Sequence, residues 1–196
     1  MVRRIPEPIP NRLHFGSGSR NVAGWINVDV HDSDVDVDLA SGQLPFATGY
    51  FSAVCSQQTI EHLVLETELV PLLREVHRVM APEGELWLSC PDMAKVADDY
   101  LRNSCASLVQ DRMDRVPRWA IRWRERDWPP SQFMNEIFHQ DGEHKNLFDL
   151  ELLSCVLHRV GFREIERTSE VLLLERFPGF PVRGDDRHAL YVRATK

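Results

Sequence analysis

Short apolar runs separated by polar turns fill the first half of the chain, and this pattern predicts the strands of a buried sheet. Strands are expected at residues 12–15, 25–30, 51–56 and 85–90, where apolar side chains continue for the length of a strand. Residues 32–38 (DSDVDVD) carry valines between aspartates, the period-two pattern of a strand with one apolar face. We interpret Asp34 and Asp36 in this run as a solvated strand edge that resists aggregation.

Helical spacing appears in residues 67–80, which place their leucines and valines on one stripe. Pro71 falls in the first turn, where proline is tolerated, and the sequence APEG at 81–84 is expected to end the helix. A helix that joins one strand to the next is typical of a parallel crossover. The expected fold class is therefore α/β, a single Rossmann-like doubly wound and mostly parallel sheet.

The last third of the chain completes the sheet. Residues 150–160 are expected to form a helix, with Asp149 as its N-cap and Gly161 as its left-handed C-cap. Strands are expected at residues 162–169 and 187–194, and residues 171–177 fit either a helix or a strand.

Net charge, cysteine spacing and the first ten residues disfavour several classes of protein. The formal charge of −7 argues against a protein that binds nucleic acid over its whole surface. Four cysteines lie far apart without zinc-ligand spacing, so we expect reduced and mostly buried thiols in a cytoplasmic protein. Residues 1–10 contain three prolines and no apolar core, so an extended N-terminal arm (residues 1–11) is expected rather than a signal peptide or membrane span.

A glycine turn and a carboxylate suggest a nucleoside site. Gly16-Ser17-Gly18 follows the first strand, and Asp29 lies near the end of the second. Glycines let the backbone approach a ligand, and a carboxylate at the next strand's tip can accept hydrogen bonds from both ribose hydroxyls. A plain turn remains the alternative. The third glycine of a dinucleotide fingerprint is missing, no lysine lies near the turn, and no G-x-x-x-x-G-K-[ST] motif occurs.

Five segments in this order carry a resemblance: FGSGSRNVAGWINVD, DLASGQLPF, FSAVCSQQTIEHL, LLREVHRVMAPEGELWLSCPD and LFDLELLSCVLHRVGFREIER. Together they resemble a class I S-adenosylmethionine-dependent methyltransferase, of the small methyltransferase-domain, type 11-like family. The resemblance implies one methyltransferase domain over residues 1–196 whose last strand is antiparallel. It also implies S-adenosylmethionine as cofactor and S-adenosylhomocysteine as product.

The resemblance also implies where the cofactor binds. The first motif, residues 15–18, would approach its methionine part, and Asp29 at the strand end would hold the ribose. Asp38 and Leu39 would lie beside the adenine, and residues 57–60 beneath the sulfonium. The implied cofactor residues are Phe15, Gly16, Ser17, Gly18, Asp29, Val30, Asp38, Leu39, Gln57, Gln58 and Ile60. Ser17 stands where relatives often have cysteine, and Arg20 where many of the wider superfamily have a third glycine.

Residues 93–146 are expected to form a helical lid that carries acceptor specificity. Trp119, Trp123 and Trp128 are interleaved with arginines, including Arg112 and Arg115. Such a pattern suits an anionic or sugar-bearing acceptor. An amphipathic helix pair with tryptophans buried against the sheet is the alternative. A small-molecule or saccharide-type acceptor, methylated on oxygen or nitrogen, is expected from the resemblance.

Methyl transfer is a direct displacement on carbon, so a base is needed only when the acceptor must lose a proton. The candidates are His62, Asp92, His139 and His144. A structural role is the alternative for each, such as a helix cap for Asp92. No metal site is expected, because the other histidines are not grouped.

Two other functions stay open at this stage. One is a nicotinamide-dependent oxidoreductase, and the other is a non-catalytic cofactor-binding homologue that activates a partner. A homo-oligomer is compatible with the sequence.

Overall fold

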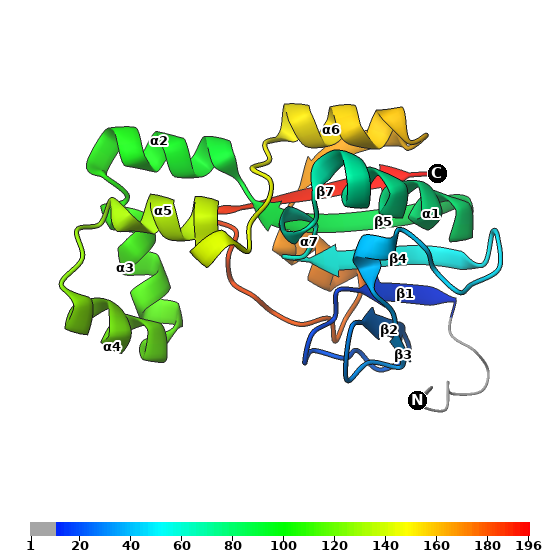
Figure 1. The fold of residues 1–196 in the computed structure, drawn as a ribbon, viewed down its shortest axis with the longest axis horizontal. Coiled ribbons are helices and arrows are strands. Elements are labelled where there is room, and N and C mark those ends of the chain that lie inside the picture. Colours follow the sequence, from blue (N-terminus) through cyan, green and yellow to red (C-terminus); the bar gives the residue numbers. More distant parts are fainter. Residues whose placement is uncertain (1–10) are drawn as a thin grey trace.

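A seven-stranded mixed sheet forms the centre of the molecule in the computed structural model, which describes residues 11–196 (Figure 1). The expected N-terminal arm therefore lies outside the described residues, apart from Asn11. The strand order is β3-β2-β1-β4-β5-β7-β6. The strands are β1 (Arg12–Phe15), β2 (Ile26–Asp29), β3 (Val35–Asp36), β4 (Phe51–Gln57), β5 (Met80–Pro91), β6 (Arg163–Thr168) and β7 (Ala189–Thr195). β7 runs antiparallel to both of its neighbours, β5 and β6, and the other strand pairs are parallel. The expected fold class, including the antiparallel last strand, is confirmed.

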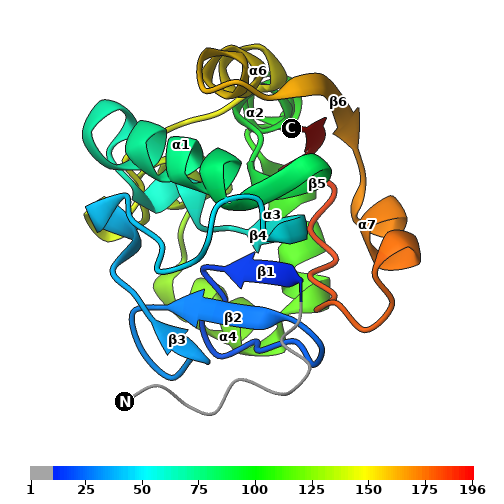
Figure 2. The same ribbon diagram turned by 90° about the vertical axis from the view of Figure 1, so that its right-hand side faces the viewer.

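Strand alternation divides the core into two layers. Helices α1 (Val70–Val79) and α6 (Leu150–Arg159) cover one face of the sheet, and α7 (Glu170–Arg176) covers the other (Figure 2). In β1, Leu13 and Phe15 pack under α1 and α6, whereas His14 points to the α7 side, where its ring meets Phe180. Both faces of the central strands are therefore buried, which explains their nearly continuous apolar sequences.

The predicted helix at 67–80 differs from the structure at both ends. A π-helical turn, Leu65–Leu69, precedes α1, and Met80 already belongs to β5. Residues 81–84 do not separate helix from strand but form an irregularity inside β5, where pairing with β4 shifts between Phe51 and Ala53. The buried Met80 side chain joins the sheet core, so packing extends the strand back through this segment.

Two other segments correct the sequence interpretation. Within residues 32–38 only β3 is a strand, and Asp34 is half-buried, accepting hydrogen bonds from the Asn27 backbone N (2.9 Å) and Nδ2 (2.7 Å). Asp34 is therefore a structural acceptor and not a solvated edge residue, whereas Asp36 is exposed. The ambiguous residues 171–177 fall mainly in α7, which Ser169 caps by accepting from the Leu172 N–H (3.3 Å).

Four helices project beyond the carboxyl ends of β4 and β5 as a helical lobe, residues 93–146 (Figure 1). They are α2 (Met93–Asn103), α3 (Ala106–Arg115), α4 (Pro117–Arg126) and α5 (Gln132–His139). The lobe has its own core, in which Trp119 and Trp123 stack with ring centroids 4.6 Å apart and Trp119 meets Phe133. These tryptophans thus pack among the lobe helices and not against the sheet, and Trp128 is 47% exposed.

All four cysteines are free thiols, and of them only Cys155 is exposed, as expected. No helix within residues 11–196 combines the length and the apolar character needed to cross a membrane.

Candidate active site

Two adjoining cavities lie beyond the carboxyl ends of the central strands. The first, about 430 Å³, is bounded by the loops that follow β1, β2 and β4, and the second, about 320 Å³, by the lobe and the loop before β7. Arg20, Gln58, His62 and Arg183 line both cavities. The predicted cofactor residues that line the first cavity are Gly16, Ser17, Gly18, Asp29, Val30, Asp38, Leu39 and Gln58. A ligand in the first cavity would therefore border a ligand in the second.

The glycine turn after β1 needs its first glycine for two reasons. Gly16 has a φ of +67°, and a Cβ there would lie 2.1 Å from Thr59 Oγ1. Gly18 also has a positive φ (+53°), but a Cβ at that position would meet open space. The first glycine allows close packing of the turn on the β4 loop, and the second leaves the backbone open to the cavity.

Asp29 is held rigidly at the end of β2. Its Oδ2 accepts from the Gly18 N–H (2.7 Å), and its Oδ1 accepts from the Val30 N–H (2.7 Å). A carboxylate has about four acceptor sites, so each oxygen can still accept a further hydrogen bond. This geometry suits a ligand with two neighbouring hydroxyl groups.

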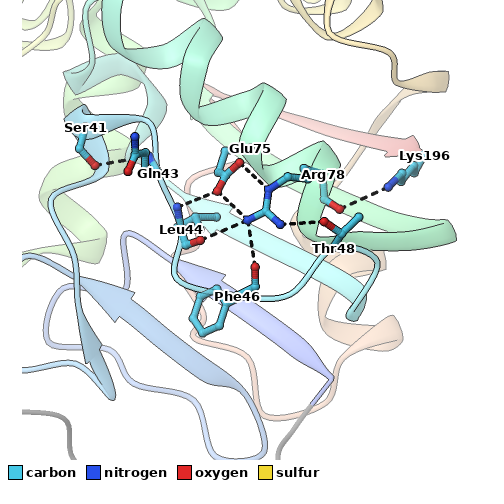
Figure 3. Close-up of polar contacts among 8 residues, drawn as sticks. All are labelled: Ser41, Gln43, Leu44, Phe46, Thr48, Glu75, Arg78 and Lys196. Atoms are coloured by element: carbon cyan, nitrogen blue, oxygen red, sulfur yellow. Dashed lines mark hydrogen bonds and ion pairs between the residues drawn. The ribbon is translucent and has the colours of Figure 1, made fainter.

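Asp38 and Leu39 lie at one end of the first cavity, and the loop that follows them is held by side chains of α1. Asp38 caps the short helix η1 (Leu39–Ser41) by accepting from the Ala40 N–H (3.0 Å). The loop that follows is tied down by Arg78, which donates to the Leu44 and Phe46 carbonyl oxygens (Figure 3). Glu75 accepts from the Leu44 N–H (3.0 Å) and pairs with Arg78 (2.7 Å). The loop after η1 is therefore held against α1 by two side chains of that helix.

Three predicted cofactor residues do not line the cavity. Phe15, Gln57 and Ile60 are buried, and Phe15 and Ile60 belong to the sheet core. The Gln57 carbonyl instead accepts from Arg183 Nη2 (2.8 Å), which places this guanidinium at the boundary of the two cavities. Arg183 has no local sequence motif to mark it as a site residue, because it lies in the irregular loop after α7.

The second cavity is rich in guanidinium groups. The Arg112 guanidinium lies over the rings of Trp119 (4.9 Å) and Phe133 (5.8 Å), and within residues 11–196 it makes no hydrogen bond or ion pair. Burial lowers the pKa of Arg112 from its ordinary value. Arg115 in contrast pairs with Asp111 (2.8 Å) and donates to the Arg183 carbonyl (3.3 Å). Arg112 therefore keeps its donors for a ligand, while its guanidinium rests on two aromatic rings of the lobe core.

Two of the predicted bases lie away from both cavities. Asp92 has no exposed surface, caps α2 by accepting from the Ala94 N–H (3.0 Å), and pairs with Arg167 (2.8 Å). The helix-cap alternative is thus the one that the structure shows for Asp92. His139 is exposed at the end of α5 and borders a separate surface hollow beside α4.

His62 and His144, in contrast, meet at the second cavity, with ring centroids 4.8 Å apart. His144 Nδ1 contacts the Ile137 carbonyl oxygen (2.5 Å), and because that oxygen only accepts, Nδ1 carries the proton. Burial lowers the pKa of His144 from its ordinary value. The neutral ring therefore keeps Nε2 as an acceptor.

Glu61 lies between these groups and was not singled out from the sequence. It is 1% exposed, and neither carboxylate oxygen has a hydrogen-bond partner among residues 11–196. Burial raises the pKa of Glu61 to about 8. A buried carboxyl without a partner is costly, and groups of this kind are found at functional sites.

Comparisons with known proteins bear on the site. The family model of a methyltransferase domain matches residues 15–88, the segment that carries the glycine turn, Asp29 and Asp38. No curated protein matches the sequence.

Several solved structures share the fold. An S-adenosylmethionine-dependent methyltransferase from Thermotoga maritima, described as a possible histamine N-methyltransferase, has a TM-score of 0.54 at 12% identity, over 94% of this chain and 81% of that chain. An S-adenosylmethionine-dependent methyltransferase from Archaeoglobus fulgidus has a TM-score of 0.52 at 14% identity, over 94% and 85%. Phosphoethanolamine N-methyltransferase 2 from Haemonchus contortus, solved with S-adenosyl-L-methionine, has a TM-score of 0.50 at 13% identity, over 94% and 47%. At these identities the likeness shows a shared fold.

Proposed function

We propose that this chain, which carries a methyltransferase domain and has the fold of class I S-adenosylmethionine-dependent methyltransferases, transfers a methyl group from that cofactor to a small acceptor. The acceptor in this proposal is a small molecule or saccharide-type compound methylated on oxygen or nitrogen. One observation supports it most strongly: the first cavity holds the glycine turn and Asp29, and it borders a second, lobe-lined cavity.

In this proposal the cofactor lies along the first cavity. Asp29 accepts hydrogen bonds from the ribose hydroxyls, and Asp38 lies beside the adenine. The sulfonium then faces the boundary formed by Gln58 and His62, beyond which the second cavity begins. Such an arrangement presents the methyl group to an acceptor while the lobe limits access of water.

Much of the rate enhancement would come from alignment of the two reactants, which can contribute about 7–11 kcal/mol in favourable cases. A hydroxyl acceptor must also lose its proton. His144 Nε2 is an acceptor at the second cavity, so among the predicted bases His144 has the best geometry for this task, with His62 next to it.

The guanidinium of Arg112 favours an acceptor that carries a negative charge, such as a carboxylate or phosphate. Arg112 has free donors at the second cavity, and Arg20 and Arg183 lie at its border with the first. Guanidinium groups bind such oxyanions through paired hydrogen bonds. Nucleic acid remains disfavoured by the overall acidic charge.

The main test is titration calorimetry with S-adenosylhomocysteine, for which we expect a dissociation constant in the micromolar range. Asp29→Ala should abolish binding, because the ribose hydroxyls lose their acceptor. Asp36→Ala is the matched control, since Asp36 is an exposed carboxylate on the adjacent strand that does not line the first cavity. Unchanged affinity in Asp29→Ala would contradict the proposed cofactor site.

Two alternatives are separated by further measurements. A nicotinamide-dependent oxidoreductase would bind NADH in the same titration, but the methyltransferase-domain match runs against this function. A non-catalytic homologue would bind the cofactor and methylate nothing in a panel of anionic and neutral acceptors.

A further inference from the structure

Glu61, His62 and His144 form a compact group of possible metal ligands. One donor atom from each lies within 4.8 Å of the other two. Glu61 and His62 belong to the short helix η2 (Ile60–His62) after β4, whereas His144 comes from the end of the helical lobe. The segment beside His144 is bound to the same helix, because the Lys145 and Asn146 N–H groups both donate to the Glu61 carbonyl oxygen (2.7 and 3.2 Å).

Glu61 is the residue whose environment is unexplained by the protein alone. Its carboxylate is almost completely buried, and within residues 11–196 both oxygens lack a hydrogen-bond partner. A carboxylate in this position requires a proton, a cation or a ligand as its partner. The nearest nitrogen donors in the group are the two imidazole rings.

The histidines are prepared to act as ligands. His144 Nδ1–H is bound to the Ile137 carbonyl oxygen, so Nε2 is the atom with a free lone pair. A hydrogen bond from the other ring nitrogen to a backbone carbonyl is the usual way in which proteins orient a metal-binding histidine. The His62 side chain makes no hydrogen bond within the described residues, and its ring packs edge-on against that of His144, with the centroids 4.8 Å apart.

We propose that Glu61, His62 and His144 bind one divalent transition-metal ion at the boundary between the two cavities. Two imidazole nitrogens and one carboxylate oxygen favour zinc or a neighbouring transition metal over magnesium or calcium, which prefer oxygen ligands. Zinc–ligand distances of about 2.0–2.2 Å place donors about 3–4 Å apart, so small side-chain rotations would close the site. Three protein ligands leave a coordination position open toward the second cavity.

The open coordination position of the ion indicates which kind of acceptor could bind there. It would accept an oxygen atom of the acceptor, and Arg112 at the same cavity would bind a negative charge on that molecule. An ion in this place would lower the pKa of a bound hydroxyl and so assist its methylation. This use of the ion rests on the proposed function, whereas the metal site itself does not.

The test is a metal titration of the full chain, freed of metal with a chelator, with ZnCl₂ in a calorimeter and with CoCl₂ by visible absorption. We expect one ion per chain and cobalt bands typical of nitrogen and oxygen ligands. Glu61→Gln and His144→Ala should each weaken zinc binding at least tenfold. His31→Ala and Glu143→Gln are matched controls, because both residues are exposed and outside the group, and they should change the affinity less than twofold.

Thermal unfolding without metal checks that each variant is folded, and it needs no cofactor. Absence of zinc binding in the folded wild-type chain would overturn the proposal. Equal binding in Glu61→Gln, His144→Ala and wild type would also overturn it, because the ion would then bind elsewhere. If the folded wild-type chain did not bind S-adenosylhomocysteine, the proposed function would be wrong. The zinc titration would still decide the metal site, because it needs no cofactor.

Discussion

The sheet and the helical lobe both contribute to the candidate active site, but they position their residues in different ways. In the sheet, Asp29 is the last residue of β2 and the glycine turn follows directly after β1, so the strand ends place them. In the lobe, Arg112 is placed by a separate core of tryptophan and phenylalanine side chains. The first cavity is therefore lined from the sheet side alone, whereas the second is lined by both the sheet side and the lobe. Mutations in the lobe core should therefore be able to affect the second cavity without the first.

The largest expected effects come from opening each core in turn. Phe133→Ala in the lobe should cost about 3–5 kcal/mol and Leu72→Ala under the sheet about 2–5 kcal/mol, since both side chains are fully buried. We expect Phe133→Ala to raise hydrogen exchange in the lobe and leave S-adenosylhomocysteine affinity within about threefold, whereas Leu72→Ala weakens the whole sheet. Equal loss of cofactor binding in the two variants would show that the lobe and the sheet are one cooperative unit.

Glycine replacements test how closely the turn after β1 packs on the β4 loop. Gly16→Ala should cost about 2–5 kcal/mol, because it combines a left-handed φ with overlap on Thr59. Gly18→Ala has the φ penalty alone, about 1–2 kcal/mol, since its Cβ would meet open space. Urea unfolding measures the difference between the two. Similar stability losses would contradict the close approach of the turn to the β4 loop.

Acid should destabilise the sheet through His14. Burial lowers the pKa of His14 from 6.5 to about 4. Between these pH values the unfolded chain binds the proton more tightly, so the free energy of unfolding should fall by about 3 kcal/mol as the pH decreases from 6.5 to 4. His14→Phe, which keeps a ring against Phe180, should remove this component. Denaturant unfolding at pH 7 and pH 4.5 measures the change in the free energy of unfolding for both proteins. An equal change in His14→Phe and wild type would show that His14 is not its source.

The smallest expected effect concerns the loop network of Figure 3. Arg78→Ala removes hydrogen bonds to the Leu44 and Phe46 carbonyls and should cost about 1–2 kcal/mol. Arg78 also holds the pKa of Glu75 below its ordinary value of 4.5, chiefly by a side-chain hydrogen bond. That stabilisation is present above pH 4.5 and is lost as the pH falls through the lower, folded-state pKa.

The variant Arg78→Ala should therefore lose less stability than wild type on acidification below pH 4.5. Arg102→Ala is the control, because its pair with Asp98 is exposed and contributes little. The two variants are compared by denaturant unfolding at pH 7 and pH 3.5. If Arg78→Ala were as acid-sensitive as wild type, the ion pair would not be the source of the effect.

The sequence by itself determined the sheet and most of the first cavity. Apolar runs marked β1, β2, β4 and the second half of β5, and residues at or just after strand ends, such as Gly16, Asp29 and Gln58, line the first cavity. These residues could be located from the sequence because the carboxyl ends of parallel strands meet at one edge of the sheet. A residue at the end of a predicted strand is therefore expected at that edge.

Only the tertiary structure decided the second cavity. Arg183 and Asp185 come from a loop far along the chain, and Glu61 differs from the other buried carboxylates of the described residues in that its oxygens have no hydrogen-bond partner. His62 and His144 were candidates from the sequence, but nothing in their spacing separated them from His139. Contacts between distant segments depend on how the lobe packs, and no local pattern of residues encodes that packing.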